Sequence, residues 1–275
     1  MQIILDMDEC LIHSQFLSGN EYRQYEDRAH EQKSTGDKSC EKFSIELPDG
    51  DVVLVNKRPG LDEFLRKVSE RWETRVFTAA LSVYAGPVLD ALDPVSGRER
   101  ENILLRVCWG GEGEKEGGDP LLIVDVHVDV VFRYSLFFLC SFPVVPTNPT
   151  TQQPNNHLPQ PLAPQDDEIF TARHYRESCT VHPSLGVYVK DLSQIIDDQD
   201  LTRVVLVDNN PMSFLSQPGN GVLVSNFYDD PDDETLPAVL GLLEEIDELR
   251  DVRPKLNKMF GLREALEGVT KGKRT

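Results

Sequence analysis

The sequence predicts an α/β fold in which a doubly wound, mostly parallel sheet carries helices on both faces. Short apolar segments alternate with amphipathic helical patterns, which is typical of such folds. Residues 203–207 form an apolar run, as strands buried on both faces of a parallel sheet usually do. Polar residues follow several apolar segments, at the sheet edge where these folds bind ligands.

The first hundred residues are expected to hold three strands and two helices. Each expected strand is a short apolar run, and each expected helix carries apolar residues three or four positions apart. The expected strands are 2–5, 52–55 and 75–77, and the expected helices are 61–72 and 84–92. Residues 17–50 are mostly polar and charged and end in a turn-like Pro-Asp-Gly sequence.

Residues 97–168 differ in composition from the rest of the chain. Between residues 135 and 165 there is no Asp, Glu, Lys or Arg, and seven of the 18 prolines fall there. Such a segment buries too little apolar surface to offset the entropy lost on ordering. We interpret 97–168 as a long disordered insertion. Its composition leaves a second interpretation open, that the segment is a gene-model artefact.

Order is expected to resume at Ile169. Strands are expected at 186–189 and 203–207, followed by a helix at 233–250 with apolar residues on one side. The predicted domain is therefore discontinuous and comprises 1–96 and 169–260. Residues 261–275 are predicted to be a flexible basic tail, for which a role in nuclear import is an alternative.

The composition argues against several classes of protein. There are 28 Lys+Arg against 47 Asp+Glu, a formal net charge of −19, so no direct nucleic-acid binding is expected. Five cysteines without close spacing indicate neither a disulfide framework nor a zinc clamp. The first residues lack a basic signal region, and the apolar stretch 121–145 is interrupted by charges. We expect a nuclear or cytoplasmic protein without membrane contact, and no oligomeric state is indicated.

Polar residues follow three of the expected strands at the point where each strand ends. They are Asp6 and Asp8, Thr78, and Asp208 and Asn209. Because the carboxyl ends of parallel strands meet at one edge of a sheet, these side chains are expected to converge.

Two aspartates two positions apart can divide the work of phosphoryl transfer. Asp6 can attack phosphorus and become an aspartyl-phosphate. Asp8 can donate a proton to the leaving oxygen and later activate water.

The remaining polar groups suit a phosphate and a cation. Mg²⁺ would neutralise charge between a carboxylate and a phosphate, and Asp208 and Asn209 offer the hard oxygen ligands that it prefers. Lys190, which follows the expected strand 186–189, could hold the phosphoryl group, with Thr78 donating a hydrogen bond.

These motifs resemble those of a known group of phosphatases. Asp6-Met-Asp-Glu-Cys-Leu11 resembles the DxDx(T/V) signature of the haloacid dehalogenase superfamily. The longer string from Leu5 to Ser14 is similar to the FCP/SCP phosphatases, which act on the C-terminal domain of RNA polymerase II. The likeness continues through Lys57-Arg-Pro-Gly-Leu-Asp-Glu-Phe64, Phe77-Thr-Ala-Ala-Leu81, Tyr175-Arg-Glu-Ser-Cys179, Tyr188-Val-Lys-Asp-Leu192 and Val207-Asp-Asn-Asn-Pro211. It covers about 1–96 and 169–250 and implies a fold like that of the haloacid dehalogenases.

The resemblance implies roles for individual residues. Asp6 would be the nucleophile and Asp8 the acid/base, while Thr78 and Lys190 would bind phosphate. The implied ligands of Mg²⁺ are Asp6, the main-chain carbonyl of Asp8, and Asn209, with Asp208 in support.

The resemblance also implies a peptide pocket. Phe16, Leu81 and Tyr84 resemble positions that line it, with simple core packing as the alternative. Arg176 resembles a substrate-contacting arginine, with an ion pair to an acidic residue as the alternative. The basic residues expected to attract a phosphopeptide are Lys57, Arg58, Arg176 and Lys190.

The chain departs from the family pattern in two places. Cys10 stands where threonine is usual, at a position expected mostly to pack. Residues 17–50 should correspond to a small inserted sheet, but 17–40 match it poorly.

Together these features imply a Mg²⁺-dependent protein serine/threonine phosphatase that acts through an aspartyl-phosphate. Its expected substrate is a phosphorylated peptide or protein, with the RNA polymerase II C-terminal domain as the leading choice. Two alternatives are a non-catalytic binding protein of the same fold, as among mitochondrial import-receptor relatives, and a small-metabolite phosphatase of the same superfamily.

Overall fold

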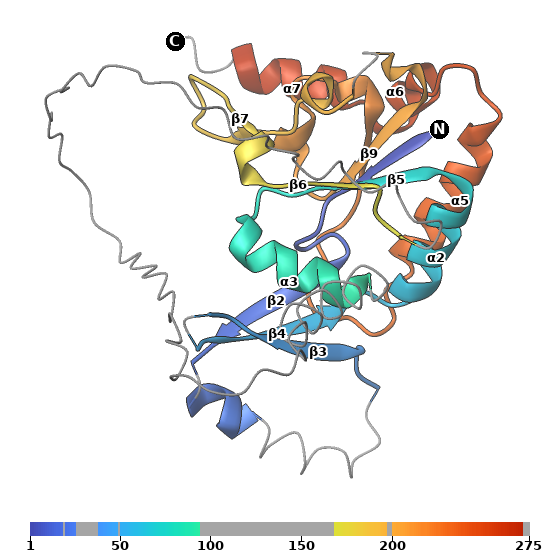
Figure 1. Ribbon diagram of the computed structural model, residues 1–275. Coiled ribbons are helices and arrows are strands. Elements are labelled where there is room, and N and C mark those ends of the chain that lie inside the picture. The colour runs from blue at the N-terminus through green and yellow to red at the C-terminus, as the bar shows by residue number, and fades with distance from the viewer. Residues whose placement is uncertain (19, 26–37, 49, 94–167, 197–199, 272–275) are drawn as a thin grey trace, which may run out of the picture. The chain divides into compact units, whose positions relative to one another are not determined.

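A five-stranded sheet, parallel throughout, forms the centre of the fold (Figure 1). The structure, a computed structural model, describes residues 1–18, 20–25, 38–48, 50–93, 168–196 and 200–271. The strands are β1 (Gln2–Leu5), β5 (Glu73–Phe77), β6 (Ala172–His174), β9 (Val204–Asp208) and β10 (Gly221–Leu223). Their order is β10-β9-β1-β5-β6, which confirms the predicted α/β class and the mostly parallel sheet.

Both faces of the sheet are covered. Ile3 and Leu5 of β1 pack into one apolar cluster, whereas Ile4 packs into a second cluster on the other face. This split follows from the alternation of side chains along a strand. It explains why Ile3–Leu5 of β1 and Val204–Val207 of β9 are apolar without interruption, since neither face meets water.

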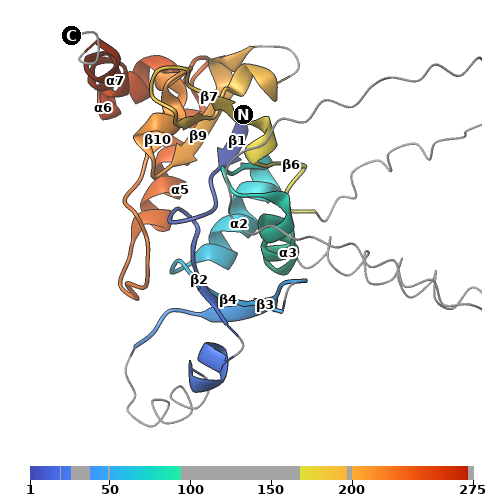
Figure 2. The ribbon, with the colours of Figure 1, turned by 90° about the vertical axis from the view of Figure 1, so that its left-hand side faces the viewer.

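Helices lie on each face, as predicted. The face of Ile3 and Leu5 is covered by α2 (Leu61–Arg71), α3 (Ser82–Leu92), α5 (Thr235–Asp247) and α6 (Arg253–Phe260). The opposite face is covered by the 3₁₀ turns η2 (Leu192–Gln194) and η4 (Pro211–Phe214) and by α7 (Leu262–Lys271). Shorter turns are η1 (Arg176–Ser178), η3 (Leu201–Arg203) and η5 (Pro218–Asn220). Figures 1 and 2 show α2 and α5 side by side.

Helix α7 corrects the prediction of a flexible tail over 261–275. Leu262 and Leu266 are four residues apart, so they share one side of the helix, and both are buried in the second cluster. The sequence signal was missed because the basic C-terminal residues dominated the composition of this short segment. Residues 272–275 lie outside the described part of the chain.

A second, smaller sheet is antiparallel, with the order β2-β4-β3. Its strands are β2 (Ile12–Leu17), β3 (Lys42–Glu46) and β4 (Val52–Lys57). The resemblance implied a small sheet within residues 17–50. In the structure β3 lies in that range, whereas β2 ends at its start and β4 follows it. Strands β2 and β3 were not predicted. In β3, Phe43 and Ile45 alternate with polar residues, which is typical of a half-buried strand, but they lie inside a charged segment.

The predicted strand 186–189 is also corrected. In the structure β8 (Tyr188–Val189) has two residues and pairs antiparallel with β7 (Thr180–Val181), outside the main sheet. Gly186, whose φ is +68°, provides the left-handed backbone in the connection between them.

The described segments before and after residues 94–167 belong to one compact unit. Strand β6 follows that stretch and pairs in parallel with β5, with Arg75 opposite Ala172. The predicted insertion, 97–168, lies outside the described residues except at residue 168. Within the described ranges, no helix combines the length and apolar character needed to span a membrane.

Candidate active site

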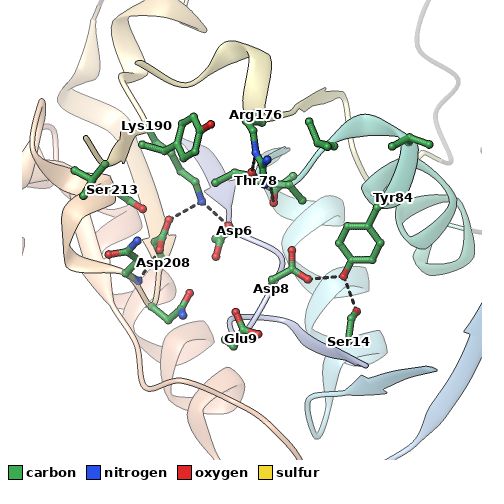
Figure 3. A pocket seen from close by; sticks show the side chains of 18 of the residues that line it. Asp6, Asp8, Glu9, Ser14, Thr78, Tyr84, Arg176, Lys190, Asp208 and Ser213 are labelled. Atoms are coloured by element: carbon green, nitrogen blue, oxygen red, sulfur yellow. Dashed lines mark hydrogen bonds and ion pairs between the residues drawn. The ribbon is translucent and has the colours of Figure 1, made fainter. Parts of the chain in front are cut away.

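The carboxyl ends of β1, β5 and β9 meet at one edge of the sheet and line a cleft of about 810 Å³ (Figure 3). The main-chain N–H of Asp6 donates to Val207 O at 2.9 Å, and that of Thr78 donates to His174 O at 2.9 Å. These bonds continue the parallel pairing just past the strand ends. The first polar residues are thereby held beside one another, as the sequence predicted.

All ten predicted site residues line this cleft. They are Asp6, Asp8, Phe16, Thr78, Leu81, Tyr84, Arg176, Lys190, Asp208 and Asn209. They come from both sides of the undescribed stretch 94–167 and from both sheets.

A tight turn after β1 presents the two aspartates. Asp6 and Asp8 line the cleft, whereas Met7 between them is fully buried. The N–H groups of Leu11 and Ile12 both donate to Met7 O, at 2.9 and 3.2 Å. Glu9 has a φ of +54°, a left-handed conformation that costs a residue with a side chain about 1–3 kcal/mol. The surrounding hydrogen bonds hold this strained turn in place.

The deepest part of the cleft is a cluster of Lys190, Asp6 and Asp208, which we call the charged centre. Lys190 Nζ forms ion pairs with Asp6 Oδ1 and, at 2.6 Å, with Asp208 Oδ2. Lys190 is 3% exposed and Asp208 is fully buried. Asn210 N donates to the other carboxylate oxygen of Asp208 at 2.7 Å. Buried charges are tolerated when paired and hydrogen-bonded in this way.

Burial and charge shift the pKa values in the charged centre. Burial, followed by the negative charge of Asp208, raises the pKa of Asp6 above its usual range. Burial lowers the pKa of Lys190, but the charges of Asp208 and Asp6 outweigh it and raise that pKa overall. Two buried carboxylates against one ammonium leave an excess of negative charge when both are ionised, which a divalent cation would neutralise.

The oxygen atoms beside Asp6 fit such a cation. The side-chain oxygen of Asn209 lies 3.0 Å from Asp6 Oδ2 and 3.3 Å from the main-chain oxygen of Asp8, while its nitrogen donates to Asn226. Acceptors facing one another repel unless a cation lies among them or the amide turns over to donate. Neighbouring ligands of octahedral Mg²⁺, at about 2.1 Å from the ion, are about 3.0 Å apart. These donors would therefore suit Mg²⁺, as the sequence predicted.

Asp8 is held by a different set of groups. Tyr84, near the start of α3, donates its hydroxyl to Asp8 Oδ1 at 2.5 Å and lies 2.6 Å from the hydroxyl of Ser14 on β2. Burial raises the pKa of Asp8 to about 6, although the hydrogen bond from Tyr84 lowers it. A carboxyl group with this pKa can both donate and accept a proton near neutral pH.

One wall of the cleft is apolar and exposed. This apolar wall consists of Phe16, Leu81, Val83 and the ring of Tyr84. Phe16 is 57% exposed, and its ring centroid lies 5.0 Å from that of Tyr84. Leu81 is 44% exposed and Val83 53%. Simple core packing, the alternative for Phe16, Leu81 and Tyr84, does not describe Phe16 and Leu81, which are this exposed. Tyr84 is half-buried and packs against the core as well as lining the cleft.

Arg176 contributes to another part of the cleft. Its Nε donates to Ala79 O at 2.6 Å, and its guanidinium lies 5.3 Å from the ring centroid of Tyr188. No ion pair of Arg176 occurs among the residues that the structure describes. The carbonyl of Ala79 and the ring of Tyr188 therefore orient the guanidinium, rather than a nearby acid as in the predicted alternative.

A protein-family model described as NLI interacting factor-like phosphatase matches residues 1–115 and 156–253, which is more than half of the chain. The chain belongs to this family. The resemblance noted in the sequence, to phosphatases of FCP/SCP type, is thereby confirmed.

Individual relatives of the NLI interacting factor-like phosphatases are distant. A probable C-terminal domain small phosphatase of Dictyostelium discoideum is 29% identical over 261 residues, covering 93% of this chain and 54% of the relative. The human carboxy-terminal domain RNA polymerase II polypeptide A small phosphatase 1 is 28% identical over 253 residues, covering 91% and 60%. The chain thus spans less than two thirds of the length of these relatives. The solved structure of Fcp1, an essential RNA polymerase II CTD phosphatase, has 16% identity and a TM-score of 0.42, covering 94% of this chain and 52% of that one.

The departure of this chain from the phosphatase signature at Cys10 is accommodated by packing. Cys10 is 1% exposed, and its thiol donates to Val207 O at 3.8 Å. A buried, weakly polar side chain of this size replaces threonine without entering the cleft. The prediction that this position mostly packs is confirmed.

The structure contradicts the prediction that Lys57 and Arg58 attract a phosphopeptide. Arg58 is 1% exposed and binds both carboxylate oxygens of Asp233, at 2.7 and 2.8 Å. It also donates to Cys10 O at 2.8 Å, which supports the turn after Asp8. Lys57 pairs with Asp62, and neither basic residue lines the cleft. Burial and strong local acids, which a linear pattern of basic residues does not reveal, determine both positions.

Several lining residues were not identified from the sequence. Ser14 lies two positions from Phe16 on β2, so both point to one side of the strand, and this period-two spacing could have indicated it. Tyr188 lies two positions before Lys190 in a motif that was already noted. Ser213, whose carbonyl accepts from Lys190 N at 3.2 Å, carries no comparable signal.

Proposed function

We propose that this chain is a Mg²⁺-dependent protein phosphatase that forms an aspartyl-phosphate on Asp6. The observation that carries the proposal is the ion pairing of Lys190 with Asp6 and Asp208 at the carboxyl edge of the sheet, beside Asp8. Membership in the NLI interacting factor-like phosphatase family supports it.

In the first step a carboxylate oxygen of Asp6 forms a bond to phosphorus while the bond to the serine or threonine oxygen breaks. The bonding electrons go to the leaving oxygen, and Asp8 supplies its proton. Lys190 balances negative charge on the transferring group. Thr78 Oγ1 accepts a hydrogen bond from Ala80 N at 3.0 Å, so its own hydrogen can turn toward a phosphoryl oxygen.

In the second step Asp8, now ionised, takes a proton from a water molecule. The water oxygen bonds to phosphorus as the bond from phosphorus to the Asp6 carboxylate breaks, which releases inorganic phosphate and restores Asp6. Asp8 ends the step protonated, as it began the cycle. Its pKa of about 6 makes both forms accessible near neutral pH.

The cation site would be formed by Asp6, the main-chain carbonyl of Asp8, and Asn209. Asp208 would support it through its bonds to Lys190 and to Asn210 N. When bound, Mg²⁺ would neutralise charge between the carboxylates and a phosphate dianion.

The proposed substrate is phosphoserine or phosphothreonine in a flexible peptide. An apolar side chain near the phosphorylated residue would pack on Phe16 and Leu81, and Arg176 would contact the peptide. Because relatives are named for the RNA polymerase II C-terminal domain, that repeat is the first peptide to test. Such a substrate would place the protein in the nucleus, with the cytoplasm as the alternative compartment.

The decisive experiment measures Mg²⁺-dependent phosphate release from phosphoserine peptides. The wild type should turn over the peptide, and Asp6→Asn, which keeps the shape of the side chain but is not a nucleophile, should release none. Asp62→Asn is the matched control, since Asp62 lies on α2 and pairs with Lys57 outside the cleft. Full activity of Asp6→Asn would remove Asp6 from the proposed role.

The two alternatives give different outcomes in the same assay. Faster turnover of sugar phosphates than of any phosphopeptide would favour a small-metabolite phosphatase. Peptide binding without phosphate release by the wild type would favour a non-catalytic binding protein.

A further inference from the structure

A hydroxyl pair connects the apolar wall to Asp8. The phenol oxygen of Tyr84 lies 2.5 Å from Asp8 Oδ1 and 2.6 Å from Ser14 Oγ. Figure 3 marks both interactions with dashed lines. The three residues come from three elements, since Tyr84 lies on α3, Ser14 on β2 and Asp8 in the turn after β1. The ring of Tyr84 lines the cleft, but its hydroxyl is directed at the carboxyl group.

The hydrogen-bonding capacity of these groups determines which oxygen of Asp8 can carry a proton. A phenol has a single hydrogen. When Tyr84 donates it to Asp8 Oδ1, that oxygen acts as an acceptor, and the proton of the neutral carboxyl group sits on Oδ2. The hydroxyl of Ser14 then donates to the phenol oxygen, which fixes the direction of the phenol O–H bond.

We infer that Tyr84 is a positioning residue that holds Asp8 with Oδ2 free to exchange a proton with the leaving oxygen, and that Ser14 orients it. The inference rests on the proposed phosphatase function and gives Tyr84 a task beyond its place in the apolar wall.

The same residue links substrate contact to proton transfer. The ring of Phe16 lies 5.0 Å from the ring of Tyr84, and Phe16 shares a side of β2 with Ser14. A peptide side chain bound on the apolar wall would therefore restrain the ring whose hydroxyl holds Asp8. Asp8 would therefore be better positioned for substrates that pack on the apolar wall than for small substrates that do not contact it.

The test uses the dependence of the reaction on the leaving group. A serine oxygen leaves poorly without a proton, whereas p-nitrophenolate leaves well without one, so a misplaced acid slows the first substrate more. The ratio kcat/KM reports the steps up to formation of the aspartyl-phosphate and is independent of its later hydrolysis. Tyr84→Phe removes the hydroxyl and keeps the ring.

We expect Tyr84→Phe to lower kcat/KM for a phosphoserine peptide about 10- to 100-fold, and for p-nitrophenyl phosphate by less than about threefold. Ser14→Ala should act in the same direction with a smaller effect. Affinity for the phosphopeptide, measured in the Asp6→Asn background, should stay within about twofold when Tyr84→Phe is added, because the ring is retained.

The matched control is Tyr22→Phe. The hydroxyl of Tyr22 lies 3.0 Å from Ser44 Oγ, so this variant also breaks a tyrosine–serine pair, but outside the cleft. It should leave both substrates unaffected.

Two results would overturn the inference while the proposed function stands. One is an equal fall for both substrates in a folded Tyr84→Phe, which would indicate a general structural role. The other is unchanged turnover of the peptide. Failure of the wild type to hydrolyse either substrate would instead overturn the proposed function, and the role of Tyr84 with it.

Discussion

The charged centre and the apolar wall are two parts of one cleft with opposite physical character. Lys190 and Asp208 are almost completely buried and satisfy one another, whereas Phe16 and Leu81 leave about half of their surface in water. Removing one member of a buried ion pair leaves an uncompensated charge, which typically costs about 3–5 kcal/mol. Truncating an exposed apolar side chain usually changes stability by less than about 0.5 kcal/mol.

This difference separates the side chains proposed for catalysis from those proposed for peptide recognition. Side chains of the charged centre depend on one another, so a change there should affect folding and catalysis together. The exposed side chains of the apolar wall contribute little to folding, and their value to the protein would lie in contact with a ligand. The comparison can be tested by changing one region at a time.

The largest effect is expected from Lys190→Met. The variant leaves Asp6 and Asp208 without their ammonium, so activity should be lost and the free energy of unfolding should fall by about 3–5 kcal/mol. Urea unfolding and phosphate release measure the two effects. Lys38→Met is the control, since Lys38 pairs with Asp232 on the surface, and it should change neither property. A Lys190→Met protein as stable as wild type would contradict the expected difference in stability between the charged centre and the apolar wall.

The next largest effect is expected on the pH dependence of the free energy of unfolding. Burial raises the pKa of Asp8 to about 6 from the 3.8 that is usual for an aspartate, so the native protein retains a proton there that the unfolded chain has lost. The proton on Asp8 therefore adds at most about 3 kcal/mol to the free energy of unfolding below about pH 4. This contribution is lost as the pH rises through about 6. Asp8→Asn should gain stability relative to wild type over this interval, in urea unfolding with EDTA. A difference that stays constant with pH would contradict the raised pKa.

Addition of Mg²⁺ should stabilise the folded protein by binding beside Asp6 and Asn209, and not through the apolar wall. At a concentration 10 to 100 times its dissociation constant, a ligand of the native state adds about 1.4–2.7 kcal/mol. The shift in melting temperature should be present in wild type and small in Asn209→Ala. Glu244→Gln, on the acidic outer face of α5, controls for general attraction of cations. Equal shifts in all three proteins would locate the bound cation elsewhere.

The smallest effect on folding is expected at the apolar wall. Phe16→Ala should raise KM for a phosphopeptide about tenfold, the equivalent of about 1.4 kcal/mol, and leave p-nitrophenyl phosphate unaffected. Its unfolding free energy should stay within about 0.5 kcal/mol of wild type. Val181→Ala, which is equally exposed on β7 but outside the cleft, should leave both substrates unchanged. Equal losses on both substrates would contradict a role in peptide recognition.

The sequence predicted the part of the site that depends on local patterns. Apolar runs identify β1, β5 and β9, and the polar residue after each run must reach the same sheet edge if the strands are parallel. Helices α2 and α5 could be predicted from their periodic apolar positions for the same reason. These properties require no knowledge of which elements pack together.

Other features depended on packing between distant elements. Lys190 was expected to follow a strand at 186–189, but it reaches the charged centre from the end of a two-residue strand in a hairpin outside the main sheet. Arg58 was expected to face the substrate but is buried against Asp233, 175 residues later. Helix α7 was expected to be part of a tail, because its burial depends on the cluster it meets.

The sequence by itself determined the chemical groups and the edge of the sheet where they gather, because residue type and strand period are local properties of the chain. The tertiary structure decided the partners of those groups. It placed the hydroxyl of Tyr84 on Asp8 and Lys190 between two carboxylates. Burial and charge neighbours arise from contacts between distant residues, such as Lys190 and Asp6, which are 184 positions apart. The physical state of each group therefore follows only from the folded chain.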